Sequence, residues 1–159
     1  MTLKKSFSPS CINSNFIFAT HLHGLTDMEE IGIKKTDEAA DLMFETGNAE
    51  TGYRHLEQIN GPAKGFFQIE GWVIKDCWDN YITFRKSIQK FLEGYGFDPD
   101  NMEFCLTSNI ALQIAFCRIC YRRKPGSIPK DIEGRAAYWK KHYNTPLGRG
   151  TVEHYLEAN

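Results

Sequence analysis

The chain has 159 residues, of which 42% are hydrophobic and 25% charged, and its formal net charge is −1. These values predict one globular domain with a sizeable core, and they exclude collagen-like, low-complexity and intrinsically disordered chains. No apolar run approaches the ~20 residues that span a bilayer, so no membrane span is expected. The residues after Lys5 are too polar for a signal peptide, and we expect synthesis in the cytoplasm.

Residues 1–32 show weak hydrophobic periodicity, which predicts an irregular N-terminal arm with at most a short strand or turn. His21 and His23 could bind a metal ion from one face of such a strand. A third ligand is not evident nearby, so a structural role is the alternative. The remaining residues, 33–159, are predicted to form the folded domain.

The first helix is predicted to begin after Thr36, because a hydroxyl at this position can cap it and two acids follow in the first turn. Gly47-Asn48 is a stop signal, so we expect Glu50 to stand just beyond the helix end. Gly52 to Gly65 is loop-like and contains the strong turn signal Asn60-Gly61-Pro62.

Apolar periodicity predicts helices in three longer segments and a cap predicts one in a short segment. Residues 75–93 carry an apolar stripe and end at glycines. Residues 108–123 are apolar nearly all round, as the central helix of a small bundle would be. Residues 131–143 follow, and a short helix is expected after Thr151. No segment alternates convincingly, so the predicted class is mainly α.

The chain has five cysteines: Cys11, Cys77, Cys105, Cys117 and Cys120. Their odd number and the lack of a compact framework predict reduced thiols. Cys117 and Cys120 have the CxxC spacing of redox and zinc sites. This pair lies inside an apolar run without a second CxxC, which favours buried helical cysteines.

Charge is distributed unevenly along the sequence. Residues 27–57 hold nine acids and three bases, whereas residues 118–150 hold nine bases and two acids. The basic half could attract an anionic polymer, such as cell wall or nucleic acid, or an acidic protein. Alternatively, it forms a solvated face that balances the acidic half.

Four short segments follow the order of motifs in one enzyme superfamily. They are Glu50-Thr51, Gly65-Phe66-Phe67-Gln68-Ile69, Asn109-Ile110-Ala111-Leu112 and Tyr143-Asn144. In that order they resemble the Glu-Ser, Gly-Leu-Met-Gln-Ile, Asn-Ile-x-x-Gly and Tyr-Asn-Ala-Gly motifs of soluble lytic transglycosylases, which belong to the lysozyme-like superfamily. Gln58 to Glu70 is also similar to short phage-encoded proteins. The resemblance implies a lysozyme-like helical domain.

The chain departs from these motifs at three points. Thr51 replaces the serine of the first motif, and Gln113 stands where the third motif has glycine. Thr145-Pro146 follows Asn144 in place of Ala-Gly. The last two departures concern residues that approach or contact the sugar chain in the family.

The resemblance implies a phage-encoded enzyme that degrades peptidoglycan without a cofactor or metal ion. Glu50 would protonate the glycosidic oxygen after N-acetylmuramic acid and then act as a base, while the sugar's C6 hydroxyl attacks to give an anhydro product. An ordinary glutamate has a pKa of ~4.3, so partial burial must raise it toward ~6–7. Hydrolysis would need a second carboxylate, with Glu70 and Asp76 as candidates. The implied glycan-binding residues are Thr51, Phe67, Gln68, Tyr143 and Asn144.

Each of these side chains also has a structural interpretation. Glu50 could be a solvated acid at a helix end. Phe67 and Tyr143 could pack in the core, and Gln68 could satisfy buried backbone groups.

Two other functions remain open. The chain could be a phage virion structural protein that keeps a lysozyme-like scaffold with little or no catalysis and binds other virion proteins. It could also be a nucleic-acid-binding domain using Arg118 to Lys141, although no zinc-finger spacing or recognition-helix motif is present. As an enzyme or virion component it would be made in the host cytoplasm and enter the virion or be released to the cell wall.

Overall fold

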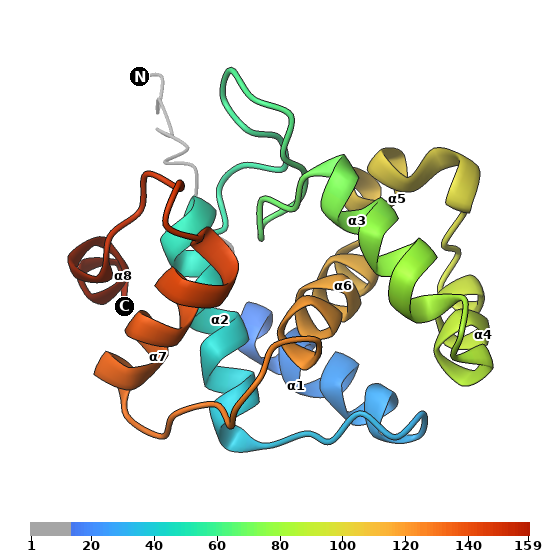
Figure 1. Ribbon diagram of the computed structural model, residues 1–159, viewed down its shortest axis with the longest axis horizontal. Helices are drawn as coiled ribbons and strands as arrows, with labels where there is room; N and C mark the ends of the chain where they lie inside the picture. Colours follow the sequence, from blue (N-terminus) through green and yellow to red (C-terminus); the bar gives the residue numbers. More distant parts are fainter. Residues whose placement is uncertain (1–13) are drawn as a thin grey trace, which may run out of the picture.

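The computed structural model describes residues 14–159, and the side chains of all of these residues except 14–19, 21 and 22. Eight α-helices and no strand occur among these residues, which confirms the mainly α class (Figure 1). The α-helices are α1 (Ser14–Glu29), α2 (Asp37–Thr51), α3 (Gly71–Cys77), α4 (Lys86–Gly94), α5 (Met102–Ser108), α6 (Ile110–Arg122), α7 (Ile132–Trp139) and α8 (Val152–Ala158). Cys11 and the first part of the predicted arm lie outside the described residues.

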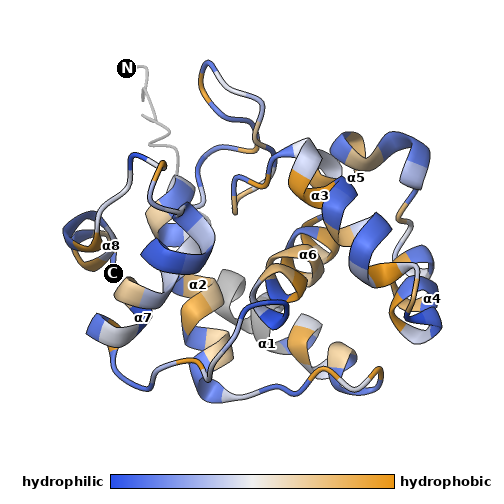
Figure 2. Ribbon diagram, viewed as in Figure 1, coloured by the Kyte–Doolittle hydropathy of each residue, from blue (hydrophilic) through white to orange (hydrophobic). Residues whose placement is uncertain are grey.

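Helix α6 is the centre of the molecule, as its sequence predicts. Figure 1 shows α2, α7 and α8 on one side of α6, and α3, α4 and α5 on the other. Every residue from Leu112 to Tyr121 is buried, and Figure 2 shows hydrophobic residues around the helix. The helix begins at Asn109, whose side-chain oxygen accepts a hydrogen bond from the Leu112 N–H at 3.2 Å. Burial of apolar surface on all sides of α6 therefore organises the fold.

The irregular arm is a wrong prediction for residues 14–29, which form α1. Leu25 and Met28 are fully buried, and α1 packs against α6 and α2. These tertiary contacts favour a helix that weak periodicity did not indicate. The predicted metal pair His21 and His23 falls in α1 and not on a strand, and the side chain of His21 lies outside the described part of the structure. The His23 ring lies 3.1 Å from Asp27.

Helix α2 is longer than predicted, because Gly47-Asn48 does not end it. The helix stops at Gly52, which has a positive φ of 56° and donates its N–H to the Asn48 carbonyl. Gly47 is needed for packing instead: a Cβ at this position would lie 2.2 Å from the Tyr53 ring. Glu50 therefore stands in the last turn of α2 and not beyond it.

The predicted helix over 75–93 is divided in the structure. Helix α3 starts earlier, at Gly71, and continues into a π-helical turn, Trp78–Ile82, before the chain bends and α4 begins. The Trp78 ring packs on Phe97 with 5.1 Å between centroids. A short 3-10 turn, Pro99–Asn101, then leads into α5, which the sequence reading missed. No glycine or proline marks the bend, so composition gave no signal for it.

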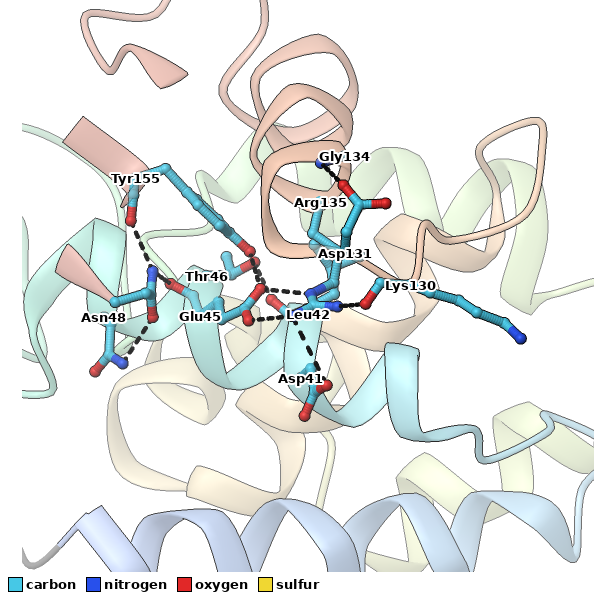
Figure 3. Close-up of polar contacts among 11 residues, drawn as sticks. Asp41, Leu42, Glu45, Thr46, Asn48, Lys130, Asp131, Gly134, Arg135 and Tyr155 are labelled. Atoms are coloured by element: carbon cyan, nitrogen blue, oxygen red, sulfur yellow. Dashed lines mark hydrogen bonds and ion pairs between the residues drawn. The ribbon is translucent and has the colours of Figure 1, made fainter. Parts of the chain in front are cut away.

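Helices α7 and α8 are attached to α2 by a buried ion pair (Figure 3). Arg135 donates two hydrogen bonds to the Glu45 carboxylate, from Nε at 2.7 Å and from Nη2 at 2.6 Å. The Tyr155 hydroxyl donates to the same carboxylate at 2.7 Å. This pair connects one acid of the acidic segment to one base of the basic segment, and it places α7 beside the end of α2.

Among residues 14–159, no single helix is long and apolar enough to cross a membrane. The bent pair Pro99–Ser108 and Ile110–Arg122, with 110° between its helices, reaches the required length and composition only when the two are taken together. Residues 106 and 112–121 of this pair are buried in the core.

Candidate active site

Glu50 lies at the wall of a large cleft. The cleft has a volume of about 780 Å³ and lies between the 58–70 loop and the segment that joins α7 to α8. Its polar lining includes Asn60, Gln68, Glu70, Asn144, Arg149 and His154. The C-terminal turn of α2 therefore presents a carboxyl group to a space that can hold an extended polar ligand.

Burial makes this carboxyl group a weaker acid than an ordinary glutamate. Loss of solvation raises the pKa of Glu50 from 4.5 to about 7, and the hydrogen bond from Trp139 partly opposes this rise. The indole Nε1–H donates to Oε1 at 3.1 Å. The carboxyl group is thus protonated in a substantial fraction of molecules at neutral pH, as a general acid must be.

Three of the predicted glycan-binding residues line the same cleft: Gln68, Tyr143 and Asn144. The Tyr143 hydroxyl donates to the Phe67 carbonyl at 2.8 Å, which joins the π-helical turn Lys140–Asn144 to the 58–70 loop. Gln68 has a positive φ of 48°, and its amide nitrogen donates to the Gly65 carbonyl at 2.8 Å. These bonds fix the orientation of both side chains before any ligand enters.

The other two predicted glycan-binding residues lie behind the cleft wall. Phe67 is only 1% exposed and packs in the core, with its ring centroid 6.3 Å from that of Tyr53. The Thr51 hydroxyl donates to the Phe66 carbonyl at 2.8 Å. Neither residue lines the cleft. Both instead connect the helix that carries Glu50 to the loop that carries Gln68.

Gln113, which replaces the glycine of the third motif, supports the same loop. Its Oε1 accepts the Phe66 N–H at 2.9 Å. Gly65, with a positive φ of 72°, lies so close that a Cβ there would be 2.8 Å from the Gln113 side chain. The missing Cβ of Gly65 therefore leaves room for the Gln113 side chain, which reaches from α6 to the loop backbone.

The two candidates for a second carboxylate differ in position. Glu70 lines the cleft, and its Oε2 accepts the Trp72 indole N–H at 2.7 Å. Asp76 forms an ion pair with Arg123 at 2.7 Å and does not line the cleft. Only Glu70 shares the cleft with Glu50.

The basic segment is not one continuous charged surface. Arg118 and Arg135 are buried, at 7% and 6% exposure, and Arg123 is paired with Asp76. Lys140 donates to the Asn144 side chain at 2.8 Å and to two carbonyls of the following loop. Several of the nine bases thus serve internal contacts, which weakens the nucleic-acid interpretation of this segment.

Sequence reasoning missed three features of the cleft. The Trp139 indole, which donates a hydrogen bond to Glu50, lies in the predicted helix 131–143 but was not among the predicted site residues. Ile59 and Leu147 line the cleft although they are 72% and 97% exposed. His154 donates from Nε2 to the Ala49 carbonyl at 2.7 Å and so braces the turn before Glu50. Of these residues, only Trp139 could have been found from the sequence, because its four-residue spacing from Tyr143 places both on one face of a helix.

Comparison with protein-family models, with curated proteins and with solved structures gives no match for this chain. The geometry itself defines a class of site: one partly buried carboxyl group facing a polar cleft lined by amide and hydroxyl side chains. Among the described residues, no three histidine, cysteine, aspartate or glutamate side chains are grouped to hold a metal ion. A carboxyl group with a pKa of about 7 can both give and take up a proton at neutral pH.

Proposed function

We propose that this chain cleaves the glycan strands of peptidoglycan, as a phage-encoded lytic transglycosylase or muramidase with a lysozyme-like helical domain. The observation that carries the proposal is the position of Glu50. This carboxyl group has a pKa of about 7 and faces a cleft of about 780 Å³. The motif residues Gln68, Tyr143 and Asn144 line the same cleft.

The first chemical step is protonation of the glycosidic oxygen. Because Trp139 holds Oε1 of Glu50, the other carboxyl oxygen is left for the substrate. Loss of its proton leaves Glu50 as a carboxylate, which then acts as the base. The bond between the anomeric carbon and the protonated oxygen breaks, and that oxygen leaves as a hydroxyl of the next sugar. The C6 hydroxyl of the muramic acid gives up its proton to Glu50 and bonds to the anomeric carbon, which produces an anhydro sugar.

Glu70 offers a hydrolytic alternative in the same cleft. A second carboxylate could activate water in place of the sugar hydroxyl, and the product would then have a reducing end. The Trp72 indole donates a hydrogen bond to Oε2 of Glu70 at 2.7 Å, which fixes the orientation of this carboxyl group. The nature of the product therefore distinguishes the two reactions.

Digestion of purified peptidoglycan tests the proposal directly. Glu50→Gln should reduce the rate of turbidity loss by about 100-fold or more, because it removes the general acid and base. Glu157→Gln, on the exposed face of α8, is the matched control and should keep wild-type activity. Equal activity in wild type and Glu50→Gln would refute the assignment.

Mass spectrometry of the released fragments then identifies the reaction. Anhydro ends that persist in Glu70→Gln indicate the single-carboxylate mechanism. Reducing ends that disappear in Glu70→Gln indicate hydrolysis by the pair.

The second candidate function is a virion structural protein with little or no catalysis. Two observations favour it: Gln113 replaces a family glycine, and Lys140 already occupies the Asn144 side chain, which the last motif would offer to a sugar. This protein would be a stoichiometric, multi-copy component of the phage particle that binds other virion proteins. Wild-type protein that leaves peptidoglycan intact, together with a high copy number in particles, would decide for it.

A further inference from the structure

Two thiols from different helices meet beside the candidate cleft. Cys77 ends α3 and Cys120 lies near the end of α6, and their Sγ atoms are 3.9 Å apart. Both are buried, at 0% and 7% exposure. The Arg123 guanidinium donates to the Cys77 sulfur at 3.1 Å and to the Asp76 carboxylate at 2.7 Å. A cation is thus positioned to stabilise a thiolate on Cys77.

This arrangement separates Cys120 from the CxxC partner that the sequence offers. Cys117 and Cys120 lie three residues apart in one helix, where Cβ atoms are about 5–6 Å apart. A disulfide needs Cβ atoms about 3.5–4.5 Å apart, so this helical pair cannot close. Cys117 is also fully buried, and burial raises the pKa of its thiol. The reactive partner of Cys120 is therefore the cysteine of α3.

A second, smaller cavity reaches Cys120, behind which Cys77 is fully buried. Its volume is about 210 Å³, and Cys120, Arg123 and Asp76 line it. It shares Gln68 and Tyr143 with the large cleft, so the two spaces meet at one wall. The hydrogen bond from Cys120, and then the Arg123 guanidinium, lower the pKa of the Cys77 thiol, while burial and, to a smaller extent, the Asp76 carboxylate oppose them. A depressed pKa increases the reactive thiolate form.

We propose that Cys77 and Cys120 form a redox-responsive pair, which a hydroperoxide entering the smaller cavity converts to a disulfide. The Cys120 sulfur, which lines the cavity, attacks one peroxide oxygen, and the O–O bond breaks. The departing oxygen takes up the Cys120 proton and leaves as water, and a sulfenic acid remains on Cys120. The Cys77 sulfur then attacks Cys120 Sγ, the S–O bond breaks, and a second water leaves with the Cys77 proton. The two thiols lose two electrons, and hydrogen peroxide gains them to become two molecules of water.

The crosslink joins α3 to α6 and closes a loop between positions 43 residues apart. Such a loop restricts the unfolded chain, so the oxidised protein should melt about 5–15 °C higher than the reduced one. The pair responds to oxidant whether or not the cleft cleaves glycans. Failure of the redox test therefore leaves the proposed enzymatic function intact, and the reverse also holds.

Peroxide treatment of the folded full-length chain tests the proposal. After treatment, free thiols are alkylated and the protein is digested without reductant for mass spectrometry. The expected result is one peptide pair joined through Cys77 and Cys120, which dithiothreitol separates. Cys117→Ser should keep this crosslink, and Cys77→Ser should abolish it.

Arg123→Gln keeps both thiols and provides a test that does not depend on folding of a cysteine variant. The crosslink should form about tenfold more slowly, because the attacking Cys77 thiolate has lost its cation. For the same reason, the pH at which the rate of crosslinking rises should shift upward. Wild-type protein that stays uncrosslinked while added free cysteine is oxidised in the same tube would overturn the proposal. A crosslink through Cys117, or an unchanged rate in Arg123→Gln, would also overturn it.

Discussion

Replacing Glu50 by glutamine should stabilise the protein in a pH-dependent way. Burial raises the pKa of Glu50 from 4.5 to about 7, so between these pH values the folded state holds a proton that the unfolded chain releases. The wild-type free energy of unfolding therefore falls as the pH rises from about 4.5 through about 7. At about 1.4 kcal/mol per pKa unit, the total cost approaches about 3 kcal/mol above pH 8.

Glutamine has no charge to lose, and its side-chain oxygen can still accept the Trp139 indole hydrogen bond. Glu50→Gln should therefore be about 2–3 kcal/mol more stable than wild type at pH 8 and about equal to it at pH 4.5. Urea unfolding followed by tryptophan fluorescence at these two pH values measures the difference.

Glu157→Gln is the control for this measurement, because Glu157 is exposed on α8. Its stability should stay within about 0.5 kcal/mol of wild type at every pH. A Glu50→Gln variant whose stability difference from wild type is the same at pH 4.5 and pH 8 would refute the reasoning. That outcome would mean that the carboxyl group titrates alike in the folded and unfolded chains, and the general acid would lose its physical basis.

Three further substitutions test the surroundings of the site. Trp139→Phe removes a donor that favours the ionised carboxylate, so the pKa of Glu50 should rise by up to about one unit, measured by NMR titration; an unchanged pKa would contradict the bond. Glu45→Ala removes two hydrogen bonds from the buried Arg135, which keeps only Asp41 at 3.8 Å and the Lys130 carbonyl, and should cost about 3 kcal/mol in urea unfolding; a loss below about 1 kcal/mol would show that the pair is solvated. Gly47→Ala would place a methyl group against the tyrosine ring and should cost about 1–3 kcal/mol; an unchanged melting temperature would show that this contact is loose.

The predictions that succeeded rest on local physics. The capping hydroxyl of Thr36 and the all-round apolar pattern of residues 110–122 gave correct helices, since caps and burial act within a few residues. The failures concern packing contacts that no helix signal in the sequence shows. Residues 14–29 are helical where they pack on α6, and Gly47 is in the helix because a tyrosine ring six residues later covers it.

The same distinction applies to the candidate site. The sequence pattern indicated Glu50, Gln68, Tyr143 and Asn144, and all four line one cleft. Phe67 looked like part of a glycan site because of its motif position, yet the turn of the chain directs its ring into the core. Contacts such as the bond from Trp139 to Glu50 join residues from different helices. No pattern within one helix can indicate them.

The hydrogen bond between Trp139 and Glu50 joins residues 89 positions apart. At a synthesis rate of about 5–20 residues per second, Glu50 is added to the growing chain roughly 4–18 s before the tryptophan. During that interval its carboxyl group is hydrated and as acidic as that of any glutamate in water. A nascent chain is therefore a poor proton donor, and this acidity changes only when the later helices dock.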